Sequence, residues 1–421
     1  MATLKLPAYS ITTRHSASLY PCQLNAGLAS KTVAVGIDVL AGGKRFCYDP
    51  WDLYSSRPRI ISSPCAVVLG KVGKGKSSLI KTYTGRQLLF GTWVGVVDPK
   101  GEYERWARYF GVSQIKVAPG GSIRINPLDP GPLGSRDPDA LRVRRVDMVA
   151  ALAASRMIAE PDAEDVNAIG YAIDEATREA QSQYPTLGGV VRRLLRPTPW
   201  MAEQMSTSVE GLATKVRGTA QSLDRLVKGD LAGMFDGQTT VNIDWDGRGV
   251  VLDLSAVHGT PALAPVMICV GTWLAQAVAR DDHRHRLLVL DELWALLHLV
   301  SVTRWLRSLE KLSRKYGLAI WMVMHRLSDL AGSSAAGSEA REQAEGLLKD
   351  VETRILYPQD ASESDALVKL LGLRESVVNL LTHRLPDHRA LWLVGQKAAV
   401  VAHVMTAIEF QYAQTDDAMA A

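Results

Sequence analysis

Short apolar runs bounded by turn residues recur along this chain and alternate with longer stretches of helical pattern. Between most of these runs, apolar positions follow the 3.6-residue period of a helix, as in the segments 78–90 and 302–316. The alternation predicts an α/β fold, with a mainly parallel sheet covered by helices on both faces. The runs that predict strands are 65–69, 93–97, 114–118, 249–254, 286–290, 319–324, 354–357 and 390–394.

The alternation is interrupted once, by a long segment without a strand-like run. Residues 137–228 contain only helical patterns and predict an all-helical subdomain inserted into the sheet domain. A proline- and glycine-rich stretch, 126–139, leads into this segment, as expected of a linker. The predicted parts are a short β-rich N-terminal element at 1–58, a core at 59–136 and 229–408, the helical insert at 137–228, and a flexible tail at 409–421.

One uncharged stretch, residues 261–279, approaches the length of a transmembrane helix. Prolines, a glycine and a glutamine interrupt it, and a strand-like run follows soon after. We therefore interpret it as a helix buried in the α/β core. The N-terminus lacks the apolar region of a signal peptide, so we expect a cytoplasmic protein without an integral membrane segment.

The composition is that of an ordinary globular protein. Of 421 residues, 47% are hydrophobic and 22% are charged, which excludes a wholly disordered chain and a coiled coil. The net charge of +4 is slight, so any surface that binds DNA must be local. The four cysteines form no CxxC pair and no histidine lies at ligand spacing, which argues against a zinc site or a disulfide framework.

The most informative motif is a glycine-rich loop directly after the run 65–69. The segment from Gly70 to Ser77 matches GxxxxGK[ST], and a helical pattern follows it. In such a loop the backbone N–H groups surround phosphates, the lysine (Lys76) reaches the β- and γ-phosphates, and the hydroxyl (Ser77) binds Mg²⁺. We therefore predict that the chain binds ATP and Mg²⁺, with nucleotide contacts from Gly70, Lys71, Val72, Gly73, Lys74, Gly75, Lys76, Ser77 and Ser78.

A second apolar run, 286–290, ends in the acidic pair Asp291 and Glu292. A buried parallel strand delivers such carboxylates to the carboxyl edge of the sheet, where ligands bind in these folds. We predict that Asp291 holds Mg²⁺ through water and that Glu292 is the general base for the attacking water. The run 319–324 is followed by His325, which is either placed to contact the γ-phosphate or an ordinary surface histidine.

Taken together, these segments resemble one division of the P-loop ATPases. The chain resembles the HerA/FtsK-type, RecA-like motor ATPases, and among them the conjugation and type IV secretion ATPases of the VirB-four/TraC family. The resemblance extends over residues 35–408 and depends on the order and spacing of several motifs. These are GKVGKGKSS (70–78), VVDPKGEY (96–103), NPLDP (126–130), GMFDG (233–237), VLDELWALL (289–297), LEKLSRKYGLAIWMVMHRLSDL (309–330), ETRILYPQ (352–359) and LLGL (370–373).

The resemblance implies a RecA-like core and a homo-hexameric ring in which each nucleotide lies between two subunits. It also implies that an arginine from the neighbouring subunit neutralises charge on the γ-phosphate. The position of the motif assigns this role to Arg314, with Arg354 as a second candidate; the alternative for Arg314 is a solvated surface arginine. The segment VVDPKGEY places Asp98 and Glu102 at a neighbouring strand end, near Mg²⁺ or the adjoining subunit.

Two features depart from the family pattern. Members often carry glutamine where this chain has His325, which affects the step that senses the γ-phosphate. The conjugation ATPases usually have a large N-terminal domain before the motor, whereas fewer than 70 residues precede the phosphate loop here. Contacts between such a domain and a membrane complex are therefore expected to be absent or to come from another chain.

The resemblance leads to one main functional hypothesis and two alternatives. The main hypothesis is a ring-forming ATPase that drives DNA or protein transfer, or channel or pilus assembly, in a type IV secretion or conjugation apparatus. Its partners would be secretion-channel or conjugation proteins, met in the cytoplasm or at the inner face of the cell membrane. One alternative is a soluble DNA translocase or coupling protein of the same superfamily, and the other is a nucleotide-binding scaffold with little hydrolysis.

Overall fold

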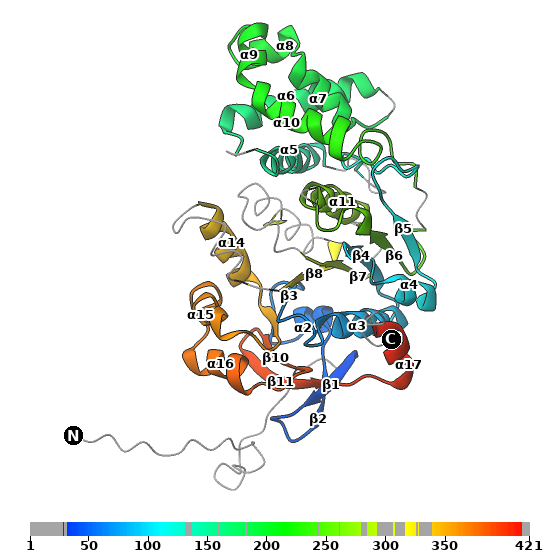
Figure 1. Ribbon diagram of the computed structural model, residues 1–421, viewed down its shortest axis with the longest axis vertical. Coiled ribbons are helices and arrows are strands. Elements are labelled where there is room, and N and C mark those ends of the chain that lie inside the picture. The colour runs from blue at the N-terminus through cyan, green and yellow to red at the C-terminus, as the bar shows by residue number, and fades with distance from the viewer. Residues whose placement is uncertain are drawn as a thin grey trace, which may run out of the picture.

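One mixed β-sheet carries all the strands of the described chain (Figure 1). The computed structural model describes residues 28, 32–130, 137–157, 160–181, 183–241, 244–260, 262–278, 284–292, 306–307, 316–325, 327 and 339–414. The strand order is β2-β1-β11-β10-β9-β3-β8-β7-β4-β6-β5. The strands are β1 (Ala34–Asp38), β2 (Lys44–Cys47), β3 (Ala66–Leu69), β4 (Trp93–Asp98), β5 (Ser113–Lys116), β6 (Gly249–Asp253), β7 (Arg286–Leu290), β8 (Leu318–Met324), β9 (Thr353–Leu356), β10 (Arg389–Val394) and β11 (Lys397–His403).

The sheet is parallel from β9 to β5 and antiparallel from β9 to β2. All eight runs predicted from the sequence form strands, and the predicted mostly parallel α/β fold is confirmed. Strand β11 adds to the predicted set. It follows β10 after a turn at Gly395 and Gln396, and so short a connection can only join antiparallel neighbours.

The N-terminal strands β1 and β2 belong to this same sheet, because β1 pairs with β11. Helix α2 (Pro50–Ser55) follows them and begins where the side chain of Asp49 accepts two backbone N–H bonds. Trp51 on this helix donates from Nε1 to the carbonyl of Gly317 at 2.9 Å. Tyr48 donates to the hydroxyl of Thr353 at 3.1 Å. The described part of the N-terminal element is therefore packed on the core.

Helices cover both faces of the sheet, as predicted. Along β3, Ala66 and Val68 point to one apolar cluster while Val67 and Leu69 point to another, as the period of a strand requires. The first cluster includes residues of α3 (Lys76–Leu89) and α4 (Glu104–Phe110), and the second includes residues of α5 and α11. Both faces of the sheet at β3 are therefore shielded from water, which explains why β3 is apolar along its whole length.

Between residues 138 and 230 the described chain contains helices joined by turns and no strand, and these helices gather at the end of the molecule opposite β1 and β2 (Figure 1). They are α5 (Pro138–Ala154), α6 (Ala163–Ala180), α7 (Leu187–Leu195), α8 (Pro199–Gln204), α9 (Val209–Lys215), α10 (Arg217–Arg225) and the π-helical turn η1 (Leu226–Asp230). Five of them start at a residue whose side chain accepts a backbone N–H of the first turn: Asp137, Asp162, Thr186, Thr198 and Ser208. Such N-caps set where each helix begins.

The long uncharged stretch forms helix α11 (Leu263–Val278), which lies between the sheet and the helical end of the molecule (Figure 1). Val266, Ile268 and Leu274 on it are buried, in line with the predicted core helix. In the part of the chain that the structure describes, no helix combines the length and the apolar character needed to cross a membrane. The remaining helical elements of the described residues are η2 (Ser255–Val257), α14 (Glu339–Asp350), η4 (Ala361–Glu363), α15 (Ser364–Leu371), α16 (Glu375–Asn379), η5 (Leu380–Arg384) and α17 (Ala407–Ala413).

Helix α17 corrects the prediction of a flexible tail from residue 409. Thr406 and Glu409 form a reciprocal capping box at its start. Glu409 also forms an ion pair with Arg86 of α3, with 2.6 Å between Arg86 Nε and Glu409 Oε1. These contacts hold the chain on the core as far as Ala413, and residues 415–421 lie outside the described part.

Candidate functional site

The predicted site residues follow strands that are neighbours in the sheet. The glycine-rich loop follows β3, His325 follows β8, the acidic pair follows β7, and Asp98 ends β4. Because the order β3-β8-β7-β4 is entirely parallel, all of these residues lie at the same carboxyl edge. The sheet therefore brings together chemistry that is spread over more than 250 residues of sequence.

The loop from Gly70 to Gly75 curls tightly between β3 and α3. A side chain at Gly70 would place its Cβ 2.4 Å from Cβ of Tyr357, so that position admits only glycine. Gly75 has φ of 103° and is the N-cap of α3, and no side chain caps this helix. The N–H groups of the first turn of α3, which includes Ser77 and Ser78, are therefore available to an anion such as phosphate.

Lys76 is buried inside the loop. Its Nζ donates to the carbonyl of Gly70 and, at 2.7 Å, to that of Lys71. Burial lowers the pKa of Lys76 to about 8, and the charge of Asp291 partly offsets this. A buried ammonium group that is held only by neutral carbonyls favours an anionic partner, which suits a phosphate-binding role.

The other two lysines of the loop bind acids of the C-terminal segments. Lys71 pairs with Asp360, and Lys74 Nζ lies 2.8 Å from Asp387 Oδ2. The backbone N–H of Lys71 donates to the carbonyl of Pro358 at 3.2 Å. Both lysine side chains are therefore engaged in ion pairs, and these pairs would have to break before either side chain could make its predicted contact with a nucleotide. Val72 is largely exposed, and Gly73 has the left-handed backbone that the curl requires.

The acidic pair is buried at the end of β7. Burial, together with the charge of Glu292, raises the pKa of Asp291 to about 6. Asp291 Oδ1 accepts the backbone N–H of Glu292 at 2.9 Å. Glu292 has φ of 55°, a left-handed conformation that costs a non-glycine residue about 1 kcal/mol. Such strain persists where the surroundings fix a side chain for a purpose.

Lys100 lies beside the predicted base, although the sequence prediction did not include it. Its Nζ forms an ion pair with Glu292 Oε1 and lies 3.3 Å from His325 Nε2. His325 Nε2 in turn lies 3.1 Å from the same Glu292 oxygen. Burial alone would lower the pKa of Lys100, but the hydrogen bond to Glu292 and the charges of Glu292, Asp291 and Glu102 together outweigh it, and the pKa is raised. The side chain of His325 is 21% exposed and contacts Glu292, and its predicted contact with the γ-phosphate stays a prediction.

Asp98 shapes the turn that carries Lys100. Its carboxylate accepts the backbone N–H groups of Lys100 at 3.2 Å, Gly101 at 2.9 Å and Tyr103 at 2.9 Å. Burial raises the pKa of Asp98, which these hydrogen bonds partly offset. Both oxygens of Asp98 are occupied by this turn, so its contribution to the site is to position Lys100. Glu102 lies closer to solvent than Asp98, and its negative charge acts to raise the pKa of both Lys76 and Lys100.

The two candidate arginines fall in different parts of the chain. Arg314 lies outside the described residues. Arg354 donates to the backbone carbonyls of Val351 at 3.0 Å, Leu371 at 3.1 Å and Lys349 at 2.9 Å. Arg354 therefore joins the ends of two helices within its own subunit.

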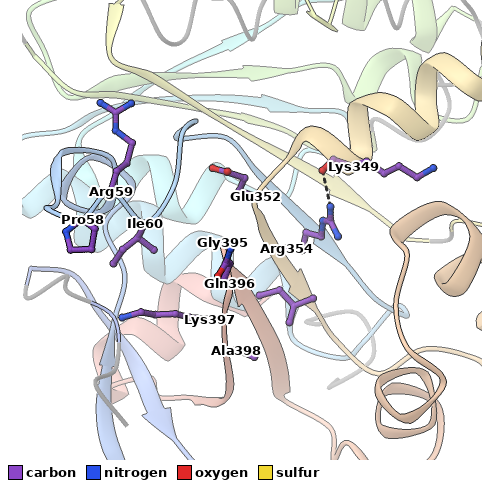
Figure 2. A pocket seen from close by; sticks show the side chains of 11 residues that line it. Pro58, Arg59, Ile60, Lys349, Glu352, Arg354, Gly395, Gln396, Lys397 and Ala398 are labelled. Carbon is purple, nitrogen blue, oxygen red and sulfur yellow. Dashed lines mark hydrogen bonds between the residues drawn. The ribbon is translucent and has the colours of Figure 1, made fainter. Parts of the chain in front are cut away.

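Arg354 also lies at the opposite edge of the sheet from the glycine-rich loop. It lines a cavity of about 700 Å³ (Figure 2), which is formed around the β10–β11 turn and residues 58–60. The strand register agrees with this placement, because Arg354 is paired with Val67, near the start of β3. Arg354 therefore lies away from the phosphate loop of its own subunit, and its role as the second candidate for the arginine supplied to a neighbouring subunit stays a prediction.

The donors present suit a magnesium ion that binds together with a nucleotide. In the described ranges no three His, Cys, Asp or Glu side chains form a group that could hold a metal ion alone. Mg²⁺ beside a nucleotide needs only one or two protein ligands, because phosphates and waters complete its shell. The hydroxyl of Ser77 and the carboxylate of Asp291 are ligands of the right kind.

The fold and this edge define the class: a RecA-like P-loop fold with an inserted helical part. No family model matches the sequence, and no curated protein is significantly similar to it. Among solved structures, VirB4 of Thermoanaerobacter pseudethanolicus is similar over 92% of this chain and 100% of its own, with 20% identity and a TM-score of 0.72. The bacterial conjugative coupling protein TrwBΔN70 is similar over 94% and 92%, with 16% identity and a TM-score of 0.61.

A further TrwB structure, described as a complex of this plasmid coupling protein with ADP and Mg²⁺, gives a comparable match. It covers 94% of this chain and 93% of its own, with 16% identity and a TM-score of 0.61. At these identities the likeness concerns the fold. It confirms the fold that the sequence resemblance predicts, including the RecA-like core.

Proposed function

We propose that this protein is a Mg²⁺-dependent ATPase that works as a ring-forming motor of a type IV secretion or conjugation apparatus. The observation that carries the proposal is the convergence of Lys76, Asp291 and Glu292 at one edge of a sheet of the VirB4 type. The charges of Asp291 and Glu292 both act on Lys76, so the three groups share one electrostatic environment. A binding loop, a metal ligand and a base in one place are the parts that phosphoryl transfer to water requires.

Each residue has a defined task in this reaction. Lys76 and the N–H groups at the start of α3 bind the phosphates, and Ser77 and Asp291 hold Mg²⁺. The metal, when bound, neutralises charge on the phosphates. Glu292 accepts the proton of the attacking water, and His325 supports Glu292 through the 3.1 Å contact.

The motor role is supported by likeness to two proteins of conjugation and secretion systems. The TM-score of 0.72 with VirB4 exceeds the 0.61 with TrwB, which favours a secretion-type ATPase over a DNA coupling protein. We propose a homo-hexamer in which Arg314 of one subunit reaches the nucleotide of the next. The ring would act at the cytoplasmic face of the membrane, where channel proteins or DNA would be its partners.

Nucleotide titration and phosphate release on purified variants test the ATPase. Lys76→Ala should abolish ATP binding, whereas Glu292→Gln should keep binding and lose turnover. Lys228→Ala is the control, because this lysine is a solvent-exposed residue of the helical insert, paired with Asp224. Wild-type turnover by Glu292→Gln would show that Glu292 is not the base, and a wild-type protein that binds no ATP would refute the proposal.

Mixing inactive subunits tests the ring. Arg314→Ala subunits retain Lys76, and Lys76→Ala subunits retain Arg314. If each site takes residues from two neighbours, mixed rings contain some intact sites and regain part of the activity. A mixture that assembles but stays inactive would contradict a shared site.

A further inference from the structure

Three charged or titratable side chains converge from three adjacent strands. Lys100 follows β4, Glu292 follows β7 and His325 follows β8, and β8 is the neighbour of the phosphate-loop strand β3. Glu292 Oε1 contacts both Lys100 Nζ and His325 Nε2. The side chain of Glu292 is 8% exposed and that of Lys100 is 28% exposed. The predicted base therefore lies inside an ion pair that is mostly screened from water.

Both partners of this pair are held by constrained backbone. Asp98 binds three N–H groups of the turn that carries Lys100, and Gly101 in that turn has φ of 73°. Glu292 occupies a left-handed conformation with φ of 55°. A Cβ at Gly101 would also lie only 3.2 Å from Cβ of Ser255, so both the backbone conformation and the available space at this position favour glycine. The ion pair is thus a built feature and not an accidental surface contact.

The pair has a direct consequence for catalysis. An oxygen of Glu292 that is engaged by an ammonium group is a poor acceptor for a proton from water. Lys100 is also close enough to Lys76 for the two cations to repel each other electrostatically. An anion bound at the phosphate loop would therefore attract Lys100 in the same way as Lys76.

We infer that Lys100 exchanges between Glu292 and the terminal phosphate of ATP. Without ATP it pairs with Glu292, and with ATP it moves to the γ-phosphate and releases Glu292 to accept the water proton. Lys100 is therefore a positioning residue that makes the base available only when a triphosphate is bound. This inference rests on the proposed function.

Exchange makes a thermodynamic prediction that a fixed ion pair does not. If binding of a triphosphate must break the pair, removing the charge of Glu292 should tighten binding of a triphosphate more than of a diphosphate. This gain should be larger when Lys100 is present than when it is absent. If the ion pair stayed fixed, the repulsion between Glu292 and the nucleotide would not depend on Lys100. The gain in triphosphate binding from Glu292→Gln would then be the same with and without Lys100.

A double-mutant cycle measured by binding alone tests the exchange. Dissociation constants for ADP and for the β,γ-imido analogue of ATP are measured with Mg²⁺ for wild type, Glu292→Gln, Lys100→Met and the double variant. Glu292→Gln should lower the ratio of the analogue constant to the ADP constant about fivefold in the wild-type background. In the Lys100→Met background that gain should fall to less than about twofold, on the order of experimental error.

Two further variants serve as controls. Lys228→Met makes the same chemical change in the helical insert and should leave the fivefold gain intact. Lys100→Gln keeps a polar side chain at the turn and should behave like Lys100→Met. Thermal unfolding of each variant shows that it is folded.

The outcomes separate this inference from the proposed function. An equal gain from Glu292→Gln in the wild-type and Lys100→Met backgrounds would overturn the exchange while nucleotide binding stands. A wild-type protein that binds neither ADP nor the analogue would refute the proposed function itself.

Discussion

The buried carboxylate of Asp291 should destabilise the nucleotide-free protein at neutral pH. Burial raises its pKa from 3.8 to about 6. A carboxyl group with a higher pKa in the folded state binds its proton more tightly there than in the unfolded chain. The free energy of unfolding therefore falls as pH rises through the window from 3.8 to about 6. Asp291→Asn removes this dependence and keeps an oxygen that can accept the Glu292 N–H.

The size of the effect follows from the width of that window. A change from 3.8 to about 6 is roughly two pKa units, and each unit corresponds to about 1.4 kcal/mol. Asp291 is buried, so solvent screens the effect only weakly. Above pH 7 the asparagine variant should exceed wild type in free energy of unfolding by up to about 3 kcal/mol, and near pH 4 the two should be almost equal.

Urea unfolding between pH 4 and pH 8, followed by circular dichroism without Mg²⁺ or nucleotide, measures this difference. Asp365→Asn is the matched control, because its side chain is 91% exposed and the same substitution there should change little at any pH. A difference between Asp291→Asn and wild type that is the same at both ends of the range would refute the reasoning. So would an asparagine variant that is less stable than wild type at pH 8.

Two other positions give predictions of opposite sign. Arg86 binds Glu409 and the carbonyls of Ala34 and Val404. Arg86→Ala should therefore lower the free energy of unfolding by about 3 kcal/mol and expose α17 to limited proteolysis. An unchanged digestion pattern would contradict this prediction. Lys81 is fully buried, has no hydrogen-bond partner for Nζ among the described residues, and burial lowers its pKa. Lys81→Met should therefore raise the free energy of unfolding by about 2 kcal/mol at pH 7. That gain should shrink as pH rises toward 10.5, because Lys81 of the wild type is then neutral when folded and folding no longer buries a charge. A gain that does not depend on pH would count against this explanation.

The eight strands from β3 to β10 were predictable because each coincides with an apolar run bounded by turn residues. The run 286–290 forms β7 with the same bounds, and β4 differs from its prediction only by Asp98. The sheet order was not predictable from such runs, since neighbours such as β3 and β8 are far apart in sequence. Strand β11 was missed because its small side chains, KAAVVAH, give a weak apolar signal.

The same distinction explains which parts of the site were found. Lys76, Asp291 and Glu292 belong to local motifs, and a motif carries its own geometry. The ion pair of Lys100 with Glu292 depends on β4 lying beside β7, which no local pattern specifies. The turn that carries Lys100 did have a local signal, because an aspartate near a proline and a glycine favours backbone N–H bonds to its own side chain.

Helix α17 shows how composition can mislead. The tail is rich in polar and small residues, which predicts fraying. Just before this tail, however, Thr406 stands three positions ahead of Glu409, which is the pattern of a capping box. The ion pair to Arg86 adds a tertiary contact that composition cannot reveal. A local capping signal was therefore the better guide at this position.

Three energetically unfavourable groups, Lys76, Asp291 and Glu292, lie together at the carboxyl edge of the sheet. Burial lowers the pKa of Lys76 and raises that of Asp291, so both charges cost stability in the absence of a ligand. Glu292 adds a strained backbone. A phosphate beside Lys76 and a cation beside Asp291 would remove both electrostatic penalties at once. A fold that stores opposite charge penalties side by side is suited to a ligand that carries both charges, and a nucleotide with its magnesium ion is such a ligand.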